Sequence, residues 1–447
     1  MNDSALVIAA YLIAVLAIGT FGRRMKGLED FHLAGRSIKL VYLTGTFCAS
    51  IIGASSTLGM AGLGFSSGLP GAWWMLSGTA GLLVLAAFFA SRVRKTGCCT
   101  LPELVGTFYG QGARCAAAVL IVISWIGVVA VQIQASGKVL GAIMNGDQAL
   151  FMVVCAAVFV LYTMHGGQSS VIRTDLLQLL IILTGMIVLF TSAWEAAGPE
   201  LLSGQSFPTS PQMGSGAVLT MLAVVGSAYL VGPDMHSRML SAHSPGEARA
   251  SAAISALILV PLAFMITSLG IFASSLYPAA SPEAAIPLLM TGLLSPALQG
   301  MVAAAMLAAF MSSADTSLMT AASILTLDIF RKASPNSSEK RLMLISRISV
   351  AVIGLSALVL AVSTPGIINT LMIAYTVFTS GLLLPVITGF YKERLGITSS
   401  GALAALVGGG VTAILLGQSY PLMGMAVSAV LLFGISWLER GLRKRGA

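Results

Sequence analysis

Residues 44–64 read TGTFCASIIGASSTLGMAGLG and carry the strongest single constraint on the fold. The stretch is long enough for a helix that crosses a bilayer core of about 30 Å, which requires about 20 apolar residues. It also contains five glycines among small hydroxyl side chains: Gly45, Gly53, Gly59, Gly62 and Gly64. A single glycine commonly serves only to let membrane helices approach closely. The density of glycine around residues 53–64, together with the free hydroxyls, predicts a helix that is broken inside the membrane.

The rest of the chain has the composition of a membrane protein. Of its 447 residues, 57% are hydrophobic and 9% are charged, and the mean hydropathy is +0.93; a soluble domain is about 25% charged. The net charge of +8 does not indicate a nucleic-acid-binding surface, because Lys and Arg fall in short clusters between apolar runs. The first apolar stretch lacks a basic leading segment, so we expect no cleavable signal peptide. The five cysteines show no metal-ligand spacing.

Apolar length and polar breaks predict about thirteen transmembrane helices. Their expected ranges are 4–22, 41–66, 71–91, 113–142, 149–165, 170–194, 214–232, 248–276, 297–330, 342–364, 367–390, 399–417 and 421–438. Of the 24 Lys and Arg residues, only Lys138 falls on the opposite side of this layout from the others. The positive-inside rule therefore places the N-terminus outside and the C-terminus in the cytoplasm. No stretch is long enough for a fused nucleotide-binding domain, and no GxxxxGK[ST] motif occurs, which argues against an ATP-driven pump.

A second interruption lies five predicted spans after the first. Residues 224–233 read VVGSAYLVGP, with Gly226, Gly232 and Pro233. Secondary transporters are commonly built from two inverted repeats, with a broken helix at matching positions and the solute and ion sites at these breaks. We therefore predict one transmembrane transporter domain over 1–447. Its parts are a peripheral helix (4–22), a first repeat of five spans (41–194), a second repeat of five spans (214–390) and two peripheral helices (399–438).

Two aspartates fall inside predicted spans, Asp175 and Asp315. A carboxylate at a helix centre costs roughly 2.5 to 3.5 kcal/mol on insertion scales, so it usually has a partner or a function. Asp315 borders a helix face with small and hydroxyl residues at spacings of three and four: Ala309, Ser312, Ser313 and Thr316. Such oxygens suit a hard cation. The alternative is that the serines only bond to carbonyls one turn back, as is common in membrane helices.

Lys138 and the four histidines are the other ionisable residues with a structural interpretation. Lys138 lies toward the outer part of 113–142, where it either extends to the outer surface or supplies a counter-charge for an anionic solute. The histidines fall at or beyond predicted cytoplasmic helix ends: His32, His165, His236 and His243. We expect them to be loop and cap residues and not a proton relay.

Six motifs together resemble the sodium:solute symporter family over nearly the whole chain. They are DFHLAGRS (30–37), SSTLGMAGLGFSSG (55–68), TLPELV (100–105), GGQSSVIRTDLLQ (166–178), PDMHSRMLSA (233–242) and AAFMSSADTSLMTAASILTLDIF (308–330). The family carries sugars, proline, pantothenate, sialic acid and monocarboxylates with sodium. The resemblance implies an all-α polytopic membrane protein with the leucine-transporter-type five-plus-five inverted repeat, which the two glycine-rich breaks predict independently.

The resemblance also implies binding residues. The family's common sodium site corresponds here to backbone oxygens of one set of residues and hydroxyls of another: Ala49, Ile52 and Ala309, then Ser312 and Ser313. Some members hold a second sodium ion nearer the cytoplasm, at positions that correspond to Asp175, Ser312, Asp315 and Thr316. Residues that contact the solute vary across the family, and the candidates here are Ser55, Ser56, Thr57, Lys138, Ser227 and Tyr229.

Two departures from the family pattern bear on the solute. Ser237 stands where many members carry Gln before the Arg, and Met75 and Gly78 stand where sugar carriers place polar contacts. Both argue against a sugar. Lys138 and the hydroxyl-rich break favour a small polar solute that bears a carboxylate.

The predicted function is sodium:solute symport by alternating access, in a multi-pass protein of the plasma or inner membrane. Its expected partners are sodium, the small-molecule solute and the lipid bilayer, with no nucleic acid, and we expect a monomer to suffice. Two alternatives stay open: a proton-coupled symporter of the same fold, with Asp175 or Asp315 as the proton carrier, and a sensor that binds solute without moving it. An enzyme is not expected, because the sequence shows no nucleophile, base and orienting residue in combination.

Overall fold

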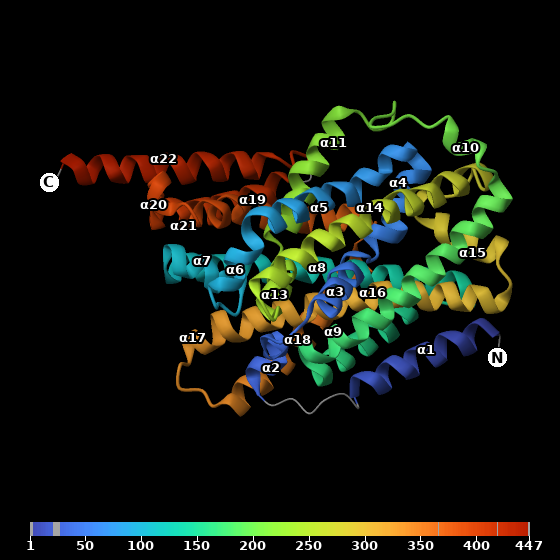
Figure 1. The fold of residues 1–447 in the computed structure, drawn as a ribbon, viewed down its shortest axis with the longest axis horizontal. Helices are drawn as coiled ribbons and strands as arrows, with labels where there is room; N and C mark the ends of the chain where they lie inside the picture. Colours follow the sequence, from blue (N-terminus) through green and yellow to red (C-terminus); the bar gives the residue numbers. More distant parts are fainter. Residues whose placement is uncertain (1–2, 21–26, 365, 418, 446–447) are drawn as a thin grey trace.

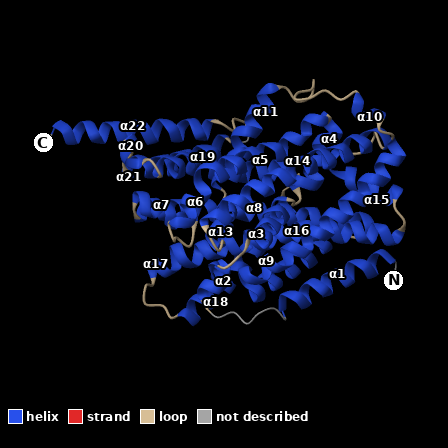
Figure 2. Cartoon of the chain, viewed as in Figure 1, coloured by secondary structure: helices blue, strands red, loops and turns tan. Residues whose placement is uncertain are grey.

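The computed structural model describes residues 3–20, 27–364, 366–417 and 419–445. Within these ranges every regular element is a helix, and strand-like pairing is limited to an isolated bridge between Ile38 and Ala242 (Figures 1 and 2). The predicted all-α class is therefore confirmed. Residues 21–26, which hold the end of the predicted span 4–22 and its first basic cluster, lie outside the described ranges.

Ten helical runs are long and apolar enough to cross a membrane. They are Leu69–Lys95, Gln111–Met144, Gln148–Ala197, Ser215–Ser241, Pro245–Leu276, Pro296–Ala333, Glu339–Ser363, Ile367–Gly389, Ser399–Leu416 and Met423–Arg443. A bent pair, Leu40–Ile51 and Ser55–Ser67, adds an eleventh if it counts as one span. These runs make the chain a multi-pass membrane protein. The number thirteen, the sides of the two termini, the repeat boundaries and the domain limits stay predictions.

The difference from thirteen has two local causes. Helix α1 (Asp3–Thr20) is apolar but short. Helix α9 (Gln148–Ala197) runs for 50 residues and joins the predicted spans 149–165 and 170–194. A straight helix of that length would extend about 75 Å, far beyond a bilayer. Gly167 interrupts α9 with a backbone φ of 58°, a conformation that glycine adopts readily, so the chain changes direction there.

The predicted break in the first long span is confirmed. Helix α3 (Leu40–Ile51) ends at Ile51, a π-helical turn covers Ser55–Gly59, α4 (Met60–Ser67) follows, and the two halves are bent by 62°. Glycine is required at Gly53, because a Cβ there would lie 2.5 Å from the Ser313 hydroxyl oxygen and 2.9 Å from the Gln132 side-chain oxygen. The main-chain N–H of Ala54, freed by the break, donates to that same Gln132 oxygen at 2.9 Å.

The second predicted break is milder. A π-helical turn covers Leu222–Gly226, α12 (Ser227–Val231) follows, Gly232 is extended, and α13 (Pro233–Ser241) begins with a proline that lacks an N–H to donate. The chain re-enters a helix at once, so the span continues to Ser241 instead of ending at residue 232 as predicted.

Helix α16 (Pro296–Ile324) forms the centre of the molecule. Every residue from Val302 to Ile324 is buried. Around it lie α1, α3, α8 (Gln111–Met144), α9 and α18 (Glu339–Ser363) (Figure 1). Because the hydroxyls and the carboxylate of α16 are shielded from water, most of them have hydrogen-bond partners on α16 itself or on neighbouring helices.

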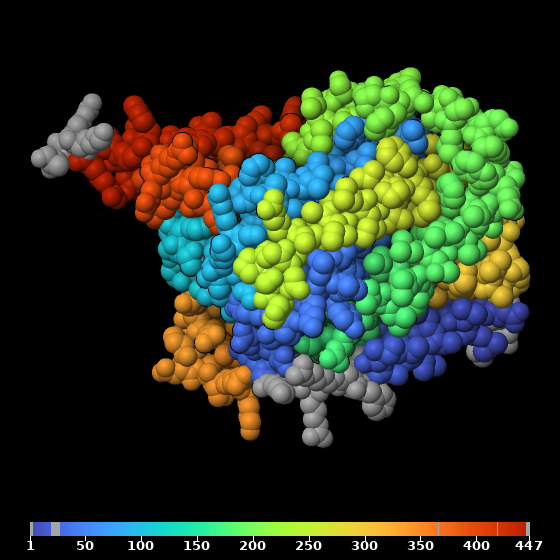
Figure 3. Space-filling model, in the orientation of Figure 1, coloured from blue at the N-terminus to red at the C-terminus, as the bar shows by residue number. Residues whose placement is uncertain are grey.

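The remaining helices cover this centre. Figure 3 shows α14 (Pro245–Leu276) running across one face between α3 and α5 (Trp73–Val84). Helices α19 (Ile367–Gly389) and α21 (Ser399–Leu416) lie on the other side of α8, and the mostly exposed α22 (Met423–Arg445) extends beyond the rest of the molecule (Figures 1 and 3). An exposed apolar helix at the edge is suited to contact with lipid.

Candidate functional site

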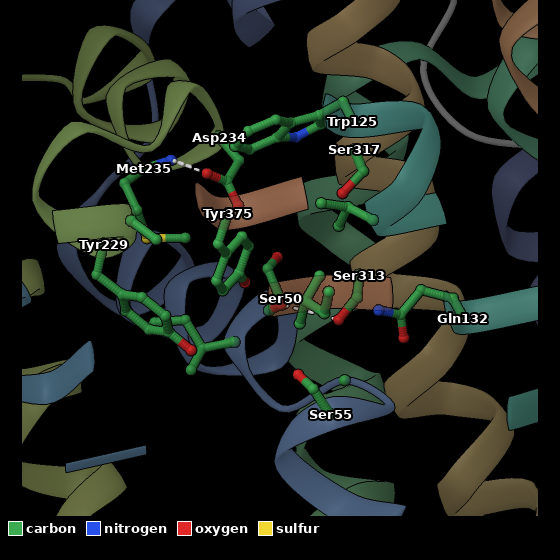
Figure 4. Close-up of a pocket in the computed structure, with 15 residues that line it drawn as sticks. Ser50, Ser55, Trp125, Gln132, Tyr229, Asp234, Met235, Ser313, Ser317 and Tyr375 are labelled. Carbon is green, nitrogen blue, oxygen red and sulfur yellow. Dashed lines mark hydrogen bonds between the residues drawn. The ribbon is translucent and has the colours of Figure 1, made fainter. Parts of the chain in front are cut away.

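A small cavity of about 30 Å³ lies beside the break between α3 and α4. Its lining comes from five parts of the chain that are distant in sequence (Figure 4): Ser50, Ile51, Gly53, Ser55, Trp125, Val128, Gln132, Ala228, Tyr229, Asp234, Met235, Ser313, Ser317, Leu371 and Tyr375. A cavity of this size has room for about one or two water molecules. Admission of a solute therefore requires its walls to move apart.

The two serines of α16 contact α3 at the break. The Ser312 hydroxyl donates to the carbonyl of Ala49 at 2.8 Å, and the Ser313 hydroxyl donates to the carbonyl of Ser50 at 2.8 Å. Ser312 also lies 3.0 Å from the carbonyl of Ala309, one turn back on its own helix. The serines thus do more than satisfy their own helix, because they connect α16 to the last turn of α3.

The five residues of the predicted sodium site therefore lie close together. Ala49, Ala309 and Ser312 share hydrogen bonds, Ser313 is next to them, and Ile52 is the residue at which α3 gives way to the break. The set offers three carbonyl oxygens and two hydroxyl oxygens and no charge. Such a donor set fits a monovalent hard cation, because the ligands are all oxygen and need not be deprotonated. The assignment of sodium to these residues stays a prediction.

The position of Arg238 corrects the sequence interpretation. Position 238 lies beyond the end of the predicted span 214–232, whereas the structure places the Arg238 side chain in α13, fully buried. The guanidinium donates to the Thr316 hydroxyl at 2.5 Å, to the Thr46 carbonyl at 3.2 Å and to the Ser50 hydroxyl. Its Nη2 lies 3.6 Å from Oδ2 of Asp175. A buried carboxylate and several hydrogen-bond acceptors allow a guanidinium to be buried at this position.

The residues of the predicted second ion site make separate contacts. Asp175 accepts a hydrogen bond from Thr46 and faces Arg238. Asp315 accepts from Thr163 of α9 at 2.8 Å. Thr316 is held by Arg238, and Ser312 is directed to α3. Arg238 therefore occupies polar space that a second cation at these residues would need.

Two of the six predicted solute-contacting residues line the cavity, namely Ser55 and Tyr229. The Ser56 hydroxyl donates to the Ile51 carbonyl at 2.7 Å, and that of Thr57 donates to the Gly53 carbonyl at 2.8 Å, so both stabilise the broken backbone. Ser227 is buried at the start of α12 without lining the cavity.

Lys138 is not among the residues that line this cavity. Its ammonium group forms an ion pair with Glu283, which lies in the 3-10 turn Pro282–Ala284 between α14 and α16. The other carboxylate oxygen of Glu283 accepts from the N–H of Ile367 at the start of α19, at 2.8 Å. Neither of the two predicted roles for Lys138 included this ion pair, whose partners are 145 positions apart in sequence.

Besides Ser50 and Ser317, sequence reasoning missed four larger polar or aromatic residues of the cavity: Trp125, Gln132, Asp234 and Tyr375. Asp234 had a usable signal, because it follows the Gly-Pro interruption directly and so had to lie near the second break. The other three belong to regular apolar helices. Their side of the helix depends on tertiary packing, which no local pattern reveals.

Two of the four histidines are buried and not in loops. The His32 ring, in α2 (Leu28–Leu33), lies between the hydroxyls of Ser323 at 2.6 Å and Ser346 at 3.1 Å, and burial lowers the pKa of His32 to about 3. His236 contacts the carbonyl of Gly232 at 2.8 Å and so caps the second break. His165 and His243 are exposed; His243 lies in the loop before α14, as expected, whereas His165 lies within α9, two residues before the interruption at Gly167.

Comparison with known proteins agrees with these features. The chain is 28% identical over 451 aligned residues to a sodium/glucose cotransporter of Vibrio parahaemolyticus, covering 90% of this chain and 82% of that protein. It is 25% identical to a sodium/pantothenate symporter of Escherichia coli strain K12, covering 91% and 89%. Sodium/glucose cotransporter 4 of Danio rerio is 26% identical, and the match spans 60% of its length. These relatives are transporters and not enzymes.

Solved structures share the fold. The structure of a sodium-coupled sialic acid symporter superimposes with a TM-score of 0.82 over 98% of both chains at 18% identity. A nucleobase-cation-symport-1 family transporter gives a TM-score of 0.64 over 93% of this chain and 94% of the other, at 13% identity. At these identities the likeness concerns the fold alone. The model of the sodium:solute symporter family matches residues 31–409, which is most of the chain, and the protein therefore belongs to the sodium:solute symporter family.

Proposed function

We propose that this protein is a symporter that imports a small polar solute together with sodium by alternating access. One observation carries the proposal: Ser312 and Ser313 of α16 each lie 2.8 Å from a carbonyl oxygen at the broken end of α3. A sodium ion among these oxygens ties the two helices together. The break beside them forms one wall of the cavity, so ion binding and the shape of the cavity are linked.

The two acceptors of the Ser312 hydroxyl allow this serine to exchange its contact with α3 for a contact with a sodium ion. Ser312 has a second acceptor, the Ala309 carbonyl at 3.0 Å, so its proton keeps a partner while an oxygen lone pair turns toward an ion. The carbonyls of Ala49 and Ala309, with Ile52 at the end of α3, supply the remaining ligands. Loss of the ion to the cytoplasm then loosens α3 from α16 and opens the solute site.

The energetics follow from linkage. If sodium raises the affinity for the solute by some factor, the solute raises the affinity for sodium by the same factor. An inside-negative potential adds about 2.3 kcal/mol per 100 mV for each positive charge that moves inward. Ser55 and Tyr229, one from each break, are the predicted solute residues that line the cavity. Lys138 is paired with Glu283 and so does not support a carboxylate on the solute, whereas the hydroxyls of the break still do.

A second sodium ion and a proton are both candidates for further coupling. A second sodium at Asp175, Ser312, Asp315 and Thr316 requires Arg238 to release Thr316. The proton alternative has an observation of its own, because Oδ1 of Asp175 is buried and has no hydrogen-bond partner among the described residues. A protonated carboxyl needs no counter-charge in such a place.

The test is uptake of a solute panel into proteoliposomes, with and without an inward sodium gradient. Wild type is compared with Ser312→Ala plus Ser313→Ala. Ser268→Ala is the matched control, because Ser268 is also buried in a helix and its hydroxyl donates to Phe264 of its own helix. Sodium-driven uptake that the control keeps and the double variant loses supports the proposal. Uptake driven equally well by a proton gradient without sodium contradicts it, and sodium-dependent binding without uptake identifies a sensor.

A further inference from the structure

The cavity contains one carboxylate and no cation. Among its lining residues Asp234 is the one with an ionisable acidic or basic side chain. One oxygen of this carboxylate accepts from the N–H of Met235 at 2.9 Å, which fixes its direction at the start of α13. The side chain is half-buried, and it makes no ion pair with any residue in the described ranges.

Arg238 and Lys138, the two cations considered as a resident counter-charge, each form an ion pair with another carboxylate. Arg238, one turn further along α13, interacts electrostatically with Asp234 but lies beyond ion-pair distance of its carboxylate: one nitrogen donates to the main-chain oxygen of Asp234 at 3.3 Å, and Nη2 faces Thr316 and Asp175. Lys138 is paired with Glu283. A partly desolvated carboxylate gains strongly from a cation and repels an anion, because the surrounding dielectric is low. The cavity therefore selects by charge.

The other walls of the cavity are aromatic. Trp125, Tyr229 and Tyr375 line it, and Figure 4 shows the rings of Trp125 and Tyr375 beside Asp234 with Tyr229 opposite. Aromatic faces attract ammonium and quaternary ammonium groups through the ring quadrupole, and Trp does so most strongly. Three aromatic rings and a carboxylate around one small space are suited to bind a positively charged nitrogen.

The rings are held in place by further aromatic contacts. The ring of Phe378 meets Trp125 edge to face at 4.9 Å and Tyr375 edge to face at 5.9 Å. Gly78 on α5 makes room for Tyr229, because a Cβ there would lie 2.7 Å from the tyrosine ring. Glycine at position 78 therefore excludes the polar contact that sugar carriers place there and brings an aromatic wall to the cavity instead.

We propose that the solute carries a positively charged nitrogen, which binds between the carboxylate of Asp234 and the rings of Trp125, Tyr229 and Tyr375. This inference rests on the proposed function for transport and on the cavity alone for binding. The Ser55 hydroxyl and the Gln132 amide, away from Asp234, and the Trp125 N–H remain as donors for a carboxylate or hydroxyl on the same molecule. Amino acids, betaines and quaternary ammonium alcohols belong to this class; sugars and simple carboxylates do not.

Binding and transport are tested separately on the purified full chain. Thermal stabilisation in sodium buffer is measured with choline, glycine betaine, proline, glucose and acetate, and uptake of the same five into proteoliposomes is measured with a sodium gradient. Stabilisation and uptake of at least one of the three nitrogen compounds is the expected result. Stabilisation by none of the three, or by glucose or acetate alone, overturns the inference. Stabilisation by a nitrogen compound without sodium-driven uptake keeps the inference and contradicts the proposed function.

Variants locate the bound nitrogen. Asp234→Asn keeps an oxygen for the Met235 N–H and removes the charge, so we expect the half-saturating concentration of the nitrogen compound to rise at least tenfold. Asp234→Glu, which restores the charge, recovers part of this loss, and Trp125→Phe raises the concentration severalfold. Asp147→Asn is the matched control, because Asp147 also caps a helix start, at 2.9 Å from the N–H of Ala149, and is exposed.

Folding of the variants is monitored by their stabilisation with sodium, which a folded protein retains. An Asp234→Asn protein that sodium still stabilises, and whose half-saturating concentration stays within twofold of wild type, overturns the inference. If Asp234→Asn does not fold, the comparison of Trp125→Phe with wild type decides, since an unchanged affinity for the nitrogen compound in that variant also overturns it.

Discussion

Replacement of Arg238 by methionine is the most informative perturbation of this structure. The substitution retains most of the apolar length of the side chain and removes a guanidinium that is fully buried. Asp175 is then left in the protein interior with Thr46 as its remaining partner. Breaking a buried ion pair by removing one member costs about 3 to 5 kcal/mol, because the other charge stays buried without compensation. We expect Arg238→Met to destabilise the protein by this amount.

The expected change is measurable as a shift of the melting temperature in detergent. An unfolding entropy of about 2.1 cal/mol/K per residue gives, for a chain of this length, about 1 °C per kcal/mol. Arg238→Met should therefore lower the melting temperature by about 3 to 5 °C. Arg249→Met, at an exposed position on α14, is the control and should change it by less than about 0.5 °C.

A second substitution separates the lost ion pair from lost packing. Replacing both members of a buried ion pair by neutral residues is often close to neutral. Asp175→Asn in the Arg238→Met background should therefore recover most of the melting temperature, although Asp175→Asn alone is destabilising. If the double variant melts no higher than Arg238→Met, or if Arg238→Met is as mild as Arg249→Met, the electrostatic account of this region is refuted.

Three further substitutions probe other parts of the structure. Gly53→Ala places a methyl group 2.5 Å from a serine hydroxyl oxygen of α16, so we expect loss of sodium-driven uptake and about 1 to 3 kcal/mol of destabilisation, whereas Gly216→Ala, with open space around it, is tolerated. Glu283→Met should lower the melting temperature more than Lys138→Met, because it also removes the oxygen that accepts the N–H at the start of α19. His32 has a pKa of about 3 when folded and about 6.5 when unfolded, so its contribution to stability is present above pH 6.5 and is lost as the pH falls toward 3. His32→Gln should flatten the decline of melting temperature between pH 6.5 and 4.5, and an unchanged slope would contradict this account.

The break in the first long span could be predicted from sequence because its cause is local. The glycines and hydroxyls at 53–64 are visible in the sequence, and their density predicts the break without knowledge of the neighbouring helices. The face of α16 with Ser312 and Ser313 was predictable for the same reason, since helical spacing alone brings its members together. The contact between Ser312 and Ala49 was expected only from the family resemblance, and the contact between Ser313 and Ser50 was not predicted.

The charges inside the protein were predicted less well. The positive-inside rule assigns a basic residue to a side of the membrane by its distance from apolar runs, and it does not consider a span that continues as a helix beyond its apolar part. Arg238 lies in such a segment, because α13 starts again directly after Gly232. Asp234 was overlooked for the same reason. Its importance depends on aromatic residues of α8, α12 and α19, which are brought together by tertiary packing.

Ser50 connects the proposed sodium and solute sites through a short chain of contacts. Its carbonyl accepts from Ser313 at 2.8 Å, its hydroxyl accepts from Arg238, and Arg238 donates to the main-chain oxygen of Asp234 at 3.3 Å. Coupling between two sites requires an element whose arrangement both ligands bias. The last turn of α3 meets this requirement, since an ion at Ser313 and a solute charge at Asp234 both act on Ser50. A sodium ion that holds α3 against α16 therefore also fixes the backbone that presents Asp234, which gives a physical route by which each ligand strengthens the binding of the other.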